Sequence, residues 1–497
     1  MKLRWFCLLV LALALAACAA QGPVRPTPAP TAPQPSASPS AAPESWRAAV
    51  PPAGPRVDLS YPVPESAKLD NGLTLLFVKR PAQVASLSVV VRHGASAVPK
   101  GKSGLAALTA RLLTEGTTAR SALALAEAAE SLGSTLDHDA GRDYSTVGIT
   151  TLSADVEAGL ELLAEVVQRP AFSPKELERV KREWIDGLTA ERQAPDRLAS
   201  LAGLRLLWGE PRGAPVGGSI PDVQKLTAKD LAKFHSERFV PGESALVVVG
   251  ELDFGALRAS AQKAFGAWKP GPAPPAPKSA APPAPDKTRV VVVNRPGAVQ
   301  SALFVAQPFP KRSEPGHEAR QLLSSLLGGL FTSRINQNLR EKNAFTYGAR
   351  SDAIATRDSG ALVVSTRVEA GVTAPALTEL IGELGRARDP SRGAPIADEE
   401  VARARADLAS SLGARLLEVD RVATDVGTGF VLGLPPSYHS ELSKLLGART
   451  TAEVAKEATR IDETRLVVVI AGDLAALRPA LEAAGFSVSE AGAELTR

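Results

Sequence analysis

Two long stretches of the chain carry the same order of apolar patterns, with strands first and helices after them. In the first stretch, the tetrapeptide Leu69–Gly72 is a turn signal typical of a β-hairpin. Apolar runs predict strands at 73–78, 85–91, 134–137, 145–151, 289–293, 301–305, 347–354 and 360–368. Apolar residues at helical period predict helices at 105–113, 122–132, 156–167, 174–192, 196–207, 318–327 and 333–341, with Ser121 as an N-cap.

Each stretch also ends in the same strand–helix unit. The apolar run Ser244–Leu252 precedes a helical pattern with Ala-Leu-Arg at 256–258, and the run Thr464–Leu474 precedes one with Ala-Leu-Arg at 476–478. This repetition indicates an internal duplication, and chance similarity of two such units is the competing interpretation. Strands grouped beside helices favour an α+β fold of two homologous halves, each a mainly antiparallel sheet with helices on one face.

Two segments rich in alanine and proline separate these stretches from the rest of the chain. Residues 19–56 hold mainly Ala, Pro, Ser and Thr, which bury too little apolar surface to offset chain entropy, so we expect a disordered tether there. We expect a second Pro/Ala-rich segment, 269–286, to link the two halves. The halves then run from 57 to 268 and from 287 to 497.

The first 18 residues have the order of a secretory signal. Lys2 and Arg4 precede an apolar run at 8–17 that is too short to span a bilayer as a helix. The run ends in Leu-Ala-Ala-Cys, which resembles a bacterial lipobox and implies lipidation of Cys18; a plain secretory signal is the alternative. Alanine at position 19 favours the outer membrane, so we expect a lipid-anchored protein of the cell envelope that faces the periplasm. Cys7 leaves with the signal, so no disulfide is predicted.

The overall charge does not favour nucleic acid as a partner. Lys and Arg number 57 against 53 Asp and Glu, the net charge is +4, and no block of basic residues occurs. The sequence offers few ligands for a metal ion, because no two of the five histidines lie within one helical turn. The sequence also offers no Ser/His/Asp or Cys/His arrangement that it can support by itself.

The segment Gly104–Thr117, on the first helix after the hairpin, resembles the zinc-binding helix of the pitrilysin/insulinase metallopeptidase family. The similarity extends over almost all of the chain beyond the tether. Active members bind zinc through an inverted His-x-x-Glu-His motif and a later glutamate. Here Ala107 and Arg111 take the histidine positions, Ala110 that of the catalytic glutamate, and Gly187 that of the third ligand. The resemblance therefore implies that this chain binds no zinc and hydrolyses no peptide alone.

A second segment, Phe331–Tyr347, resembles the family stretch that presents an arginine and a tyrosine to the substrate. Arg340 and Tyr347 match these positions, so the arginine is expected to end a helix and the tyrosine to open the next strand. The implied role of both is to donate hydrogen bonds to the scissile carbonyl and to the oxyanion that develops from it. The competing interpretation is a solvated helix end, with Arg340 paired to Glu341 and Tyr347 packed as a strand residue.

A chain with this pair but without zinc ligands resembles the non-catalytic subunit of heterodimeric family members. The resemblance implies a zinc-bearing homologue as partner, zinc in that partner subunit, and a peptide substrate in a chamber that both chains enclose. Under this hypothesis, the chain completes a composite peptidase site. The alternative is a non-catalytic scaffold or peptide-binding lipoprotein of the cell envelope, in which Arg340 and Tyr347 have no such role.

Overall fold

The computed structural model describes residues 61–272, 275 and 285–496. The expected signal peptide, Cys18, the tether and most of the expected linker lie outside these residues. The two halves together form one compact unit. Among the described residues, no helix combines the length and the apolar character that crossing a membrane requires.

The first half contains one six-stranded sheet with a single parallel pair. Its order is β1-β2-β6-β3-β5-β4, so the last strand of the half lies between the second and the third. Strand β6 is parallel to β2 and antiparallel to β3, and the other neighbours are antiparallel. The strands are β1 (Glu65–Lys68), β2 (Thr74–Lys79), β3 (Val84–Val91), β4 (Leu136–Ala140), β5 (Ser145–Leu152) and β6 (Ser244–Gly250).

The second half repeats this topology. Its sheet has the order β12-β7-β11-β8-β10-β9, in which the late strand β11 again lies between the first two long strands and pairs in parallel with the first. The strands are β7 (Arg289–Asn294), β8 (Gln300–Pro308), β9 (Ala349–Ala355), β10 (Gly360–Glu369), β11 (Val467–Gly472) and β12 (Val488–Glu490). The equal strand order confirms the predicted duplication, and only the outer strands β1 and β12 differ in direction.

Helices follow the strands in both halves. The first half has α2 (Leu105–Leu113), α3 (Ala122–Glu130), α4 (Val156–Gln168), α5 (Pro174–Glu191), α6 (Pro195–Trp208), α7 (Ile220–Lys225), α8 (Ala228–Arg238) and α9 (Phe254–Phe265). The second has α10 (His317–Ser324), α11 (Arg334–Asn336), α12 (Thr373–Arg388), α13 (Asp398–Arg415), α14 (Val419–Leu432), α15 (Tyr438–Gly447), α16 (Thr451–Ala458), α17 (Leu474–Ala483) and α18 (Ala493–Thr496).

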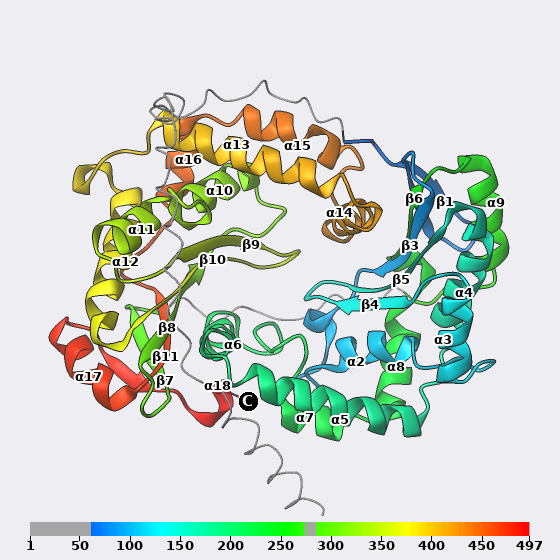
Figure 1. Ribbon diagram of the computed structural model, residues 1–497, viewed down its shortest axis with the longest axis horizontal. Helices are drawn as coiled ribbons and strands as arrows, with labels where there is room; N and C mark the ends of the chain where they lie inside the picture. The colour runs from blue at the N-terminus through cyan, green and yellow to red at the C-terminus, as the bar shows by residue number, and fades with distance from the viewer. Residues whose placement is uncertain (1–60, 273–274, 276–284, 497) are drawn as a thin grey trace, which may run out of the picture. The chain divides into compact units, whose positions relative to one another are not determined.

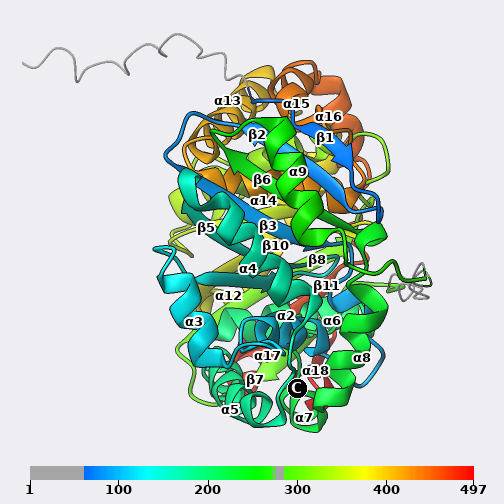
Figure 2. The same cartoon turned by 90° about the vertical axis from the view of Figure 1, so that its right-hand side faces the viewer.

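One face of each sheet packs on helices of its own half. Alternate residues of β3, such as Leu87 and Val89, are buried in a core with Leu108 of α2 and Leu163 of α4. Figure 2 shows α4 and α9 in front of the strands of the first sheet. The α+β class, the mainly antiparallel sheets and the helical layer are therefore as predicted.

The other face of each sheet is covered by one helix from the opposite half. Helix α6 packs Ala202 against Phe304 of the second sheet, and α14 packs Val426 against Val90 of the first. Figure 1 shows α6 beside β8 and β11. A Cβ at Gly203 would lie 2.2 Å from the ring of Phe304, so this glycine lets α6 approach the sheet closely. The sequence predicted helices on one face only, and this exchange of helices adds a second covered face.

One predicted boundary near the candidate site is wrong. The sequence placed Tyr347 in a strand that begins there, but β9 begins at Ala349. A π-helical segment, Gln337–Lys342, ends shortly before this point. Ala344 then adopts a left-handed backbone conformation with φ +54°. This turn keeps the chain out of the sheet for two more residues.

Candidate functional site

Three of the four positions that the resemblance assigned to the zinc motif line one cavity. Ala107 and Arg111 lie one turn apart on the same side of α2, and Gly187 faces them from α5, around a cavity of about 700 Å³. The fourth, Ala110, is fully buried and does not line the cavity. The structure thus brings together the positions that the resemblance assigned to zinc ligands, with side chains that contain no zinc donor.

Close backbone contacts fix α2 and α5 around this cavity. Helix α2 begins after Gly104, which has φ +91°, and a Cβ there would lie 2.9 Å from the carbonyl oxygen of Gly217. Trp184 of α5 donates a hydrogen bond from Nε1 to the same carbonyl oxygen, at 2.8 Å. One loop therefore holds both helices in place.

The guanidinium of Arg111 belongs to an ion-pair network at the edge of the cavity. Its Nη1 lies 2.5 Å from Oε1 of Glu115, a carboxylate that is only 8% exposed. Arg179 of α5 pairs with the other oxygen of Glu115, and also with Glu176 and Glu183. Hydrogen bonds to Glu176 and Glu115 raise the pKa of Arg179. Two arginines and three glutamates therefore form one network, and the guanidinium of Arg111 takes a position that the resemblance assigns to a zinc ligand.

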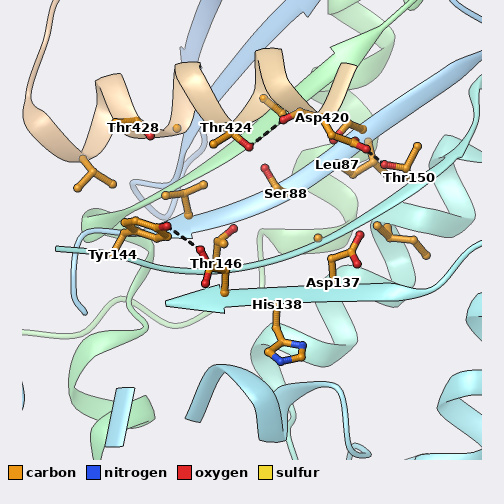
Figure 3. Close-up of a pocket in the computed structure, with 18 residues that line it drawn as sticks. Leu87, Ser88, Asp137, His138, Tyr144, Thr146, Thr150, Asp420, Thr424 and Thr428 are labelled. Atoms are coloured by element: carbon orange, nitrogen blue, oxygen red, sulfur yellow. Dashed lines mark hydrogen bonds between the residues drawn. The ribbon is translucent and has the colours of Figure 1, made fainter. Parts of the chain in front are cut away.

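One histidine lines this cavity, and the sequence analysis did not single it out. His138 lies on β4 beside α2, and Figure 3 shows its ring on the opposite side of the strand from Asp137. Burial, and after it the charge of Arg111, lower the pKa of His138 to about 4. The sequence around His138 shows only the alternation of a short polar strand. This pattern does not indicate that β4 lies against α2.

These residues do not fit a zinc ion. Ala107 and Gly187 have no donor atom and Arg111 is a cation. His138, Asp139, Glu183 and Glu191 also line the cavity, but they do not form the group of three or four ligands that zinc sites use. Across residues 61–272 and 285–496, no three His, Cys, Asp or Glu side chains form a group that could hold a metal ion. No catalytic step through zinc is derived for this half.

The cavity also borders a free sheet edge. Strand β4 pairs only with β5, so the backbone N–H and C=O groups on its other side are available to a further strand. Residues 138–140 of β4 line the cavity itself. An extended peptide could therefore add to this edge through main-chain hydrogen bonds.

The Arg/Tyr pair lies in the second half and does not line this cavity. The guanidinium of Arg340 stacks on the ring of Phe331, 3.9 Å from its centroid, and its Nε lies 3.5 Å from Glu341. Tyr347 is 95% exposed, and its hydroxyl has no hydrogen-bond partner among the described residues. Among the described residues, no hydrogen bond or cation–π contact joins Arg340 and Tyr347. Tyr347 is not packed as a strand residue, whereas the pairing of Arg340 with Glu341 is present.

Comparisons with known proteins agree with this architecture. Residues 74–202 match the family model "Insulinase (Peptidase family M16)", and residues 225–408 match "Peptidase M16 inactive domain". The chain belongs to peptidase family M16. Ala107, Arg111 and Gly187 lie in the first matched region, and Arg340 and Tyr347 lie in the second.

Three similar proteins show how widely the similarity extends. An uncharacterized zinc protease of Mycobacterium tuberculosis is 28% identical over 63% of this chain and 71% of its own. The crystal structure of a peptidase M16 inactive domain from Pseudomonas fluorescens is 25% identical, covers 82% of this chain and 98% of its own, and has a TM-score of 0.75. Subunit 1 of the bovine mitochondrial cytochrome b-c1 complex is 25% identical over 41% of this chain and 43% of its own.

Proposed function

We propose that this chain is a non-catalytic M16 subunit that pairs with a zinc-bearing homologue and contributes Arg340 and Tyr347 to a shared peptide site. The zinc and the general base belong to the partner subunit in this proposal, and the substrate is a peptide. The observation that carries the proposal is the guanidinium of Arg111, which is paired with Glu115 at a position that the resemblance assigns to a zinc ligand. The exposed hydroxyl of Tyr347 supports a role toward a second molecule.

Reconstitution with a zinc-bearing M16 homologue from the same organism tests the proposal. We expect peptide cleavage when both chains are present and none with this chain alone. Arg340→Ala should reduce kcat by about 10²–10³-fold, because one donor to a developing oxyanion is worth about that much. Arg258→Ala, an exposed arginine on α9, is the matched control and should leave the rate unchanged. Full activity of the Arg340→Ala complex would contradict the proposed role of the pair.

A scaffold without any part in catalysis is the second candidate. It is favoured by the contacts of Arg340, which stacks on Phe331 and pairs with Glu341 within its own chain. The similarity to a subunit of a respiratory complex agrees with it. In that case a complex with the partner forms, but Arg340→Ala and Tyr347→Phe leave its activity unchanged.

We also propose that the chain is anchored through a lipid on Cys18 at the periplasmic side of the outer membrane. The charged, apolar and small residues of positions 1–18 support this location. Radioactive palmitate should label the wild-type chain in cells and should not label Cys18→Ser. Labelling of the variant, or a wild-type chain found free in the periplasm, would overturn the anchor.

A further inference from the structure

The guanidinium of Arg340 is held by its face and not by its edge. It lies over the ring of Phe331, 3.9 Å from the centroid, and its Nε lies 3.5 Å from the carboxylate of Glu341. Neither of its Nη atoms has a hydrogen-bond partner among the described residues. A guanidinium carries five N–H donors in one plane, so the ring occupies one face and leaves the Nη–H groups free to donate to a second molecule.

Two other stacked arginines of the chain use their edges within the fold. Arg92 lies over the ring of Phe430, 3.8 Å from its centroid, and donates a hydrogen bond from Nε to a backbone carbonyl oxygen at 3.0 Å. Arg142 lies over the ring of Trp208 at 4.8 Å and donates from Nη1 to a backbone carbonyl oxygen at 3.2 Å. Their stacks join parts of the fold, whereas the stack of Arg340 leaves donors unused.

Phe331 lies outside the core that its neighbours enter. Its ring is 61% exposed, whereas Leu330 packs against the core of the second half and Ile335 is fully buried in it. Among the described residues, the stack with Arg340 is its only aromatic or cation–π contact. An exposed ring buries little apolar surface, so replacing it should affect Arg340 more than the stability of the fold.

A buried asparagine fixes the backbone that carries this ring. Asn336 is only 5% exposed, and its Nδ2 donates hydrogen bonds to the carbonyl oxygens of Leu330 at 2.9 Å and of Ala349 at 3.1 Å. Its Oδ1 accepts one from the N–H of Ala349 at 2.7 Å. The residue before Phe331 is thereby joined to the first residue of β9, two residues after Tyr347. Supporting hydrogen bonds of this kind hold the side chains of a site in place.

We propose that Phe331 is a positioning residue for Arg340 in the shared peptide site. The inference rests on the proposed function, in which Arg340 donates hydrogen bonds to the scissile carbonyl and to the oxyanion that develops from it. A free arginine side chain has many rotamers, and a cation–π contact restricts them before the substrate binds. The ring accepts no hydrogen bond from the edge of the guanidinium, so it orients this group without competing with the substrate.

Kinetics of the reconstituted complex test this role. Phe331→Leu removes the aromatic face and keeps an apolar side chain, so kcat should fall about three- to tenfold while KM changes less. Phe331→Tyr keeps the ring and should retain the kcat of the wild type. Phe430→Leu, which removes the stack under Arg92, is the matched control and should leave kcat unchanged.

A double-mutant cycle separates positioning from a structural effect. In the Arg340→Ala background, Phe331→Leu should cause no further loss of kcat, because a positioning residue acts only through the group that it holds. Equal losses in both backgrounds would overturn the inference. It would also fail alone if Arg340→Ala impaired the complex and Phe331→Leu did not, since the proposed function would then still stand. A wild-type complex that cleaves no peptide would overturn both.

NMR of the chain without its partner measures the stack directly. The Nε–H signal of Arg340, assigned by its loss in Arg340→Lys, should show the heteronuclear NOE of a restrained side chain in the wild type and in Phe331→Tyr. The value should be lower in Phe331→Leu, because the guanidinium then moves freely. Equal values in the wild type and Phe331→Leu would show that the ring does not hold Arg340 and would overturn the inference.

Discussion

Arg111 is the residue that most clearly separates the cavity between α2 and α5 from a metal centre. Its guanidinium occupies a ligand position on α2, is held by the carboxylate of Glu115, and lines the cavity together with His138. A guanidinium has no lone pair to offer a metal ion, and its pairing with Glu115 takes up a carboxylate that could otherwise bind one. The same charge explains part of the low pKa of His138.

Arg111→Ala should therefore raise the pKa of His138 above about 4. Burial, the larger cause of the low value, stays in place, so the pKa should remain below the usual 6.5 or so of an exposed histidine. An NMR titration of the His138 ring measures the shift. Arg258→Ala serves as control and should leave the titration curve unchanged, and an unchanged curve in Arg111→Ala would show that the two side chains do not interact.

At the scale of elements, local apolar patterns were sufficient to predict the helices and strands that bury one face. The apolar spacing of 105–113 predicted α2 with the boundaries that the structure has, and Ser121 caps α3 by accepting a hydrogen bond from the N–H of Ala124. Ala107 and Arg111 share a helix face in any packing, but their assignment to ligand positions comes from the family resemblance. The assignment of Gly187 has the same basis, and no local pattern indicated that α5 brings it to the same cavity.

Contacts between distant elements could not be predicted from the sequence. The apolar residues of α6 indicate burial, but nothing local states that the second sheet, beyond the linker, buries them. His138 was missed for the same reason, because its importance comes from the packing of β4 beside α2. The start of β9 was placed too early, because alanine at 344 gives no signal of a left-handed turn.

At the scale of the whole molecule, the histidines link stability to pH. Burial is the largest cause that lowers the pKa of each one to about 4, and this applies to His93, His138, His235, His317 and His439. In the unfolded chain their pKa is about 6.5. Between these values the unfolded state binds more protons than the folded state, so stability falls as the pH falls from about 6.5 to 4.

We expect the free energy of unfolding to be nearly constant above pH 7 and to fall steeply below pH 6. Each histidine contributes a slope of up to about 1.4 kcal/mol per pH unit in this window. Buried Asp143 and Asp425, whose pKa values are raised, oppose the trend only toward its acid end. Urea unfolding at several pH values measures the slope.

His235→Phe provides the control for this pH dependence. The ring of His235 stacks on Phe239, with centroids 4.9 Å apart, so an aromatic replacement keeps the contact and removes one titrating group. In this variant, the free energy of unfolding should change less with pH, by the contribution of one histidine. A stability that does not change between pH 7 and 5 in the wild type would contradict the burial of these rings.

Elemental analysis of the purified chain, combined with a peptidase assay of the same sample, tests the central claim most directly. The ion-paired Arg111 and the donor-free Ala107 and Gly187 predict much less than one zinc per chain, even after incubation with zinc, and no cleavage until the zinc-bearing homologue is added. One tightly bound zinc per chain, together with proteolysis by the chain alone, would contradict the account.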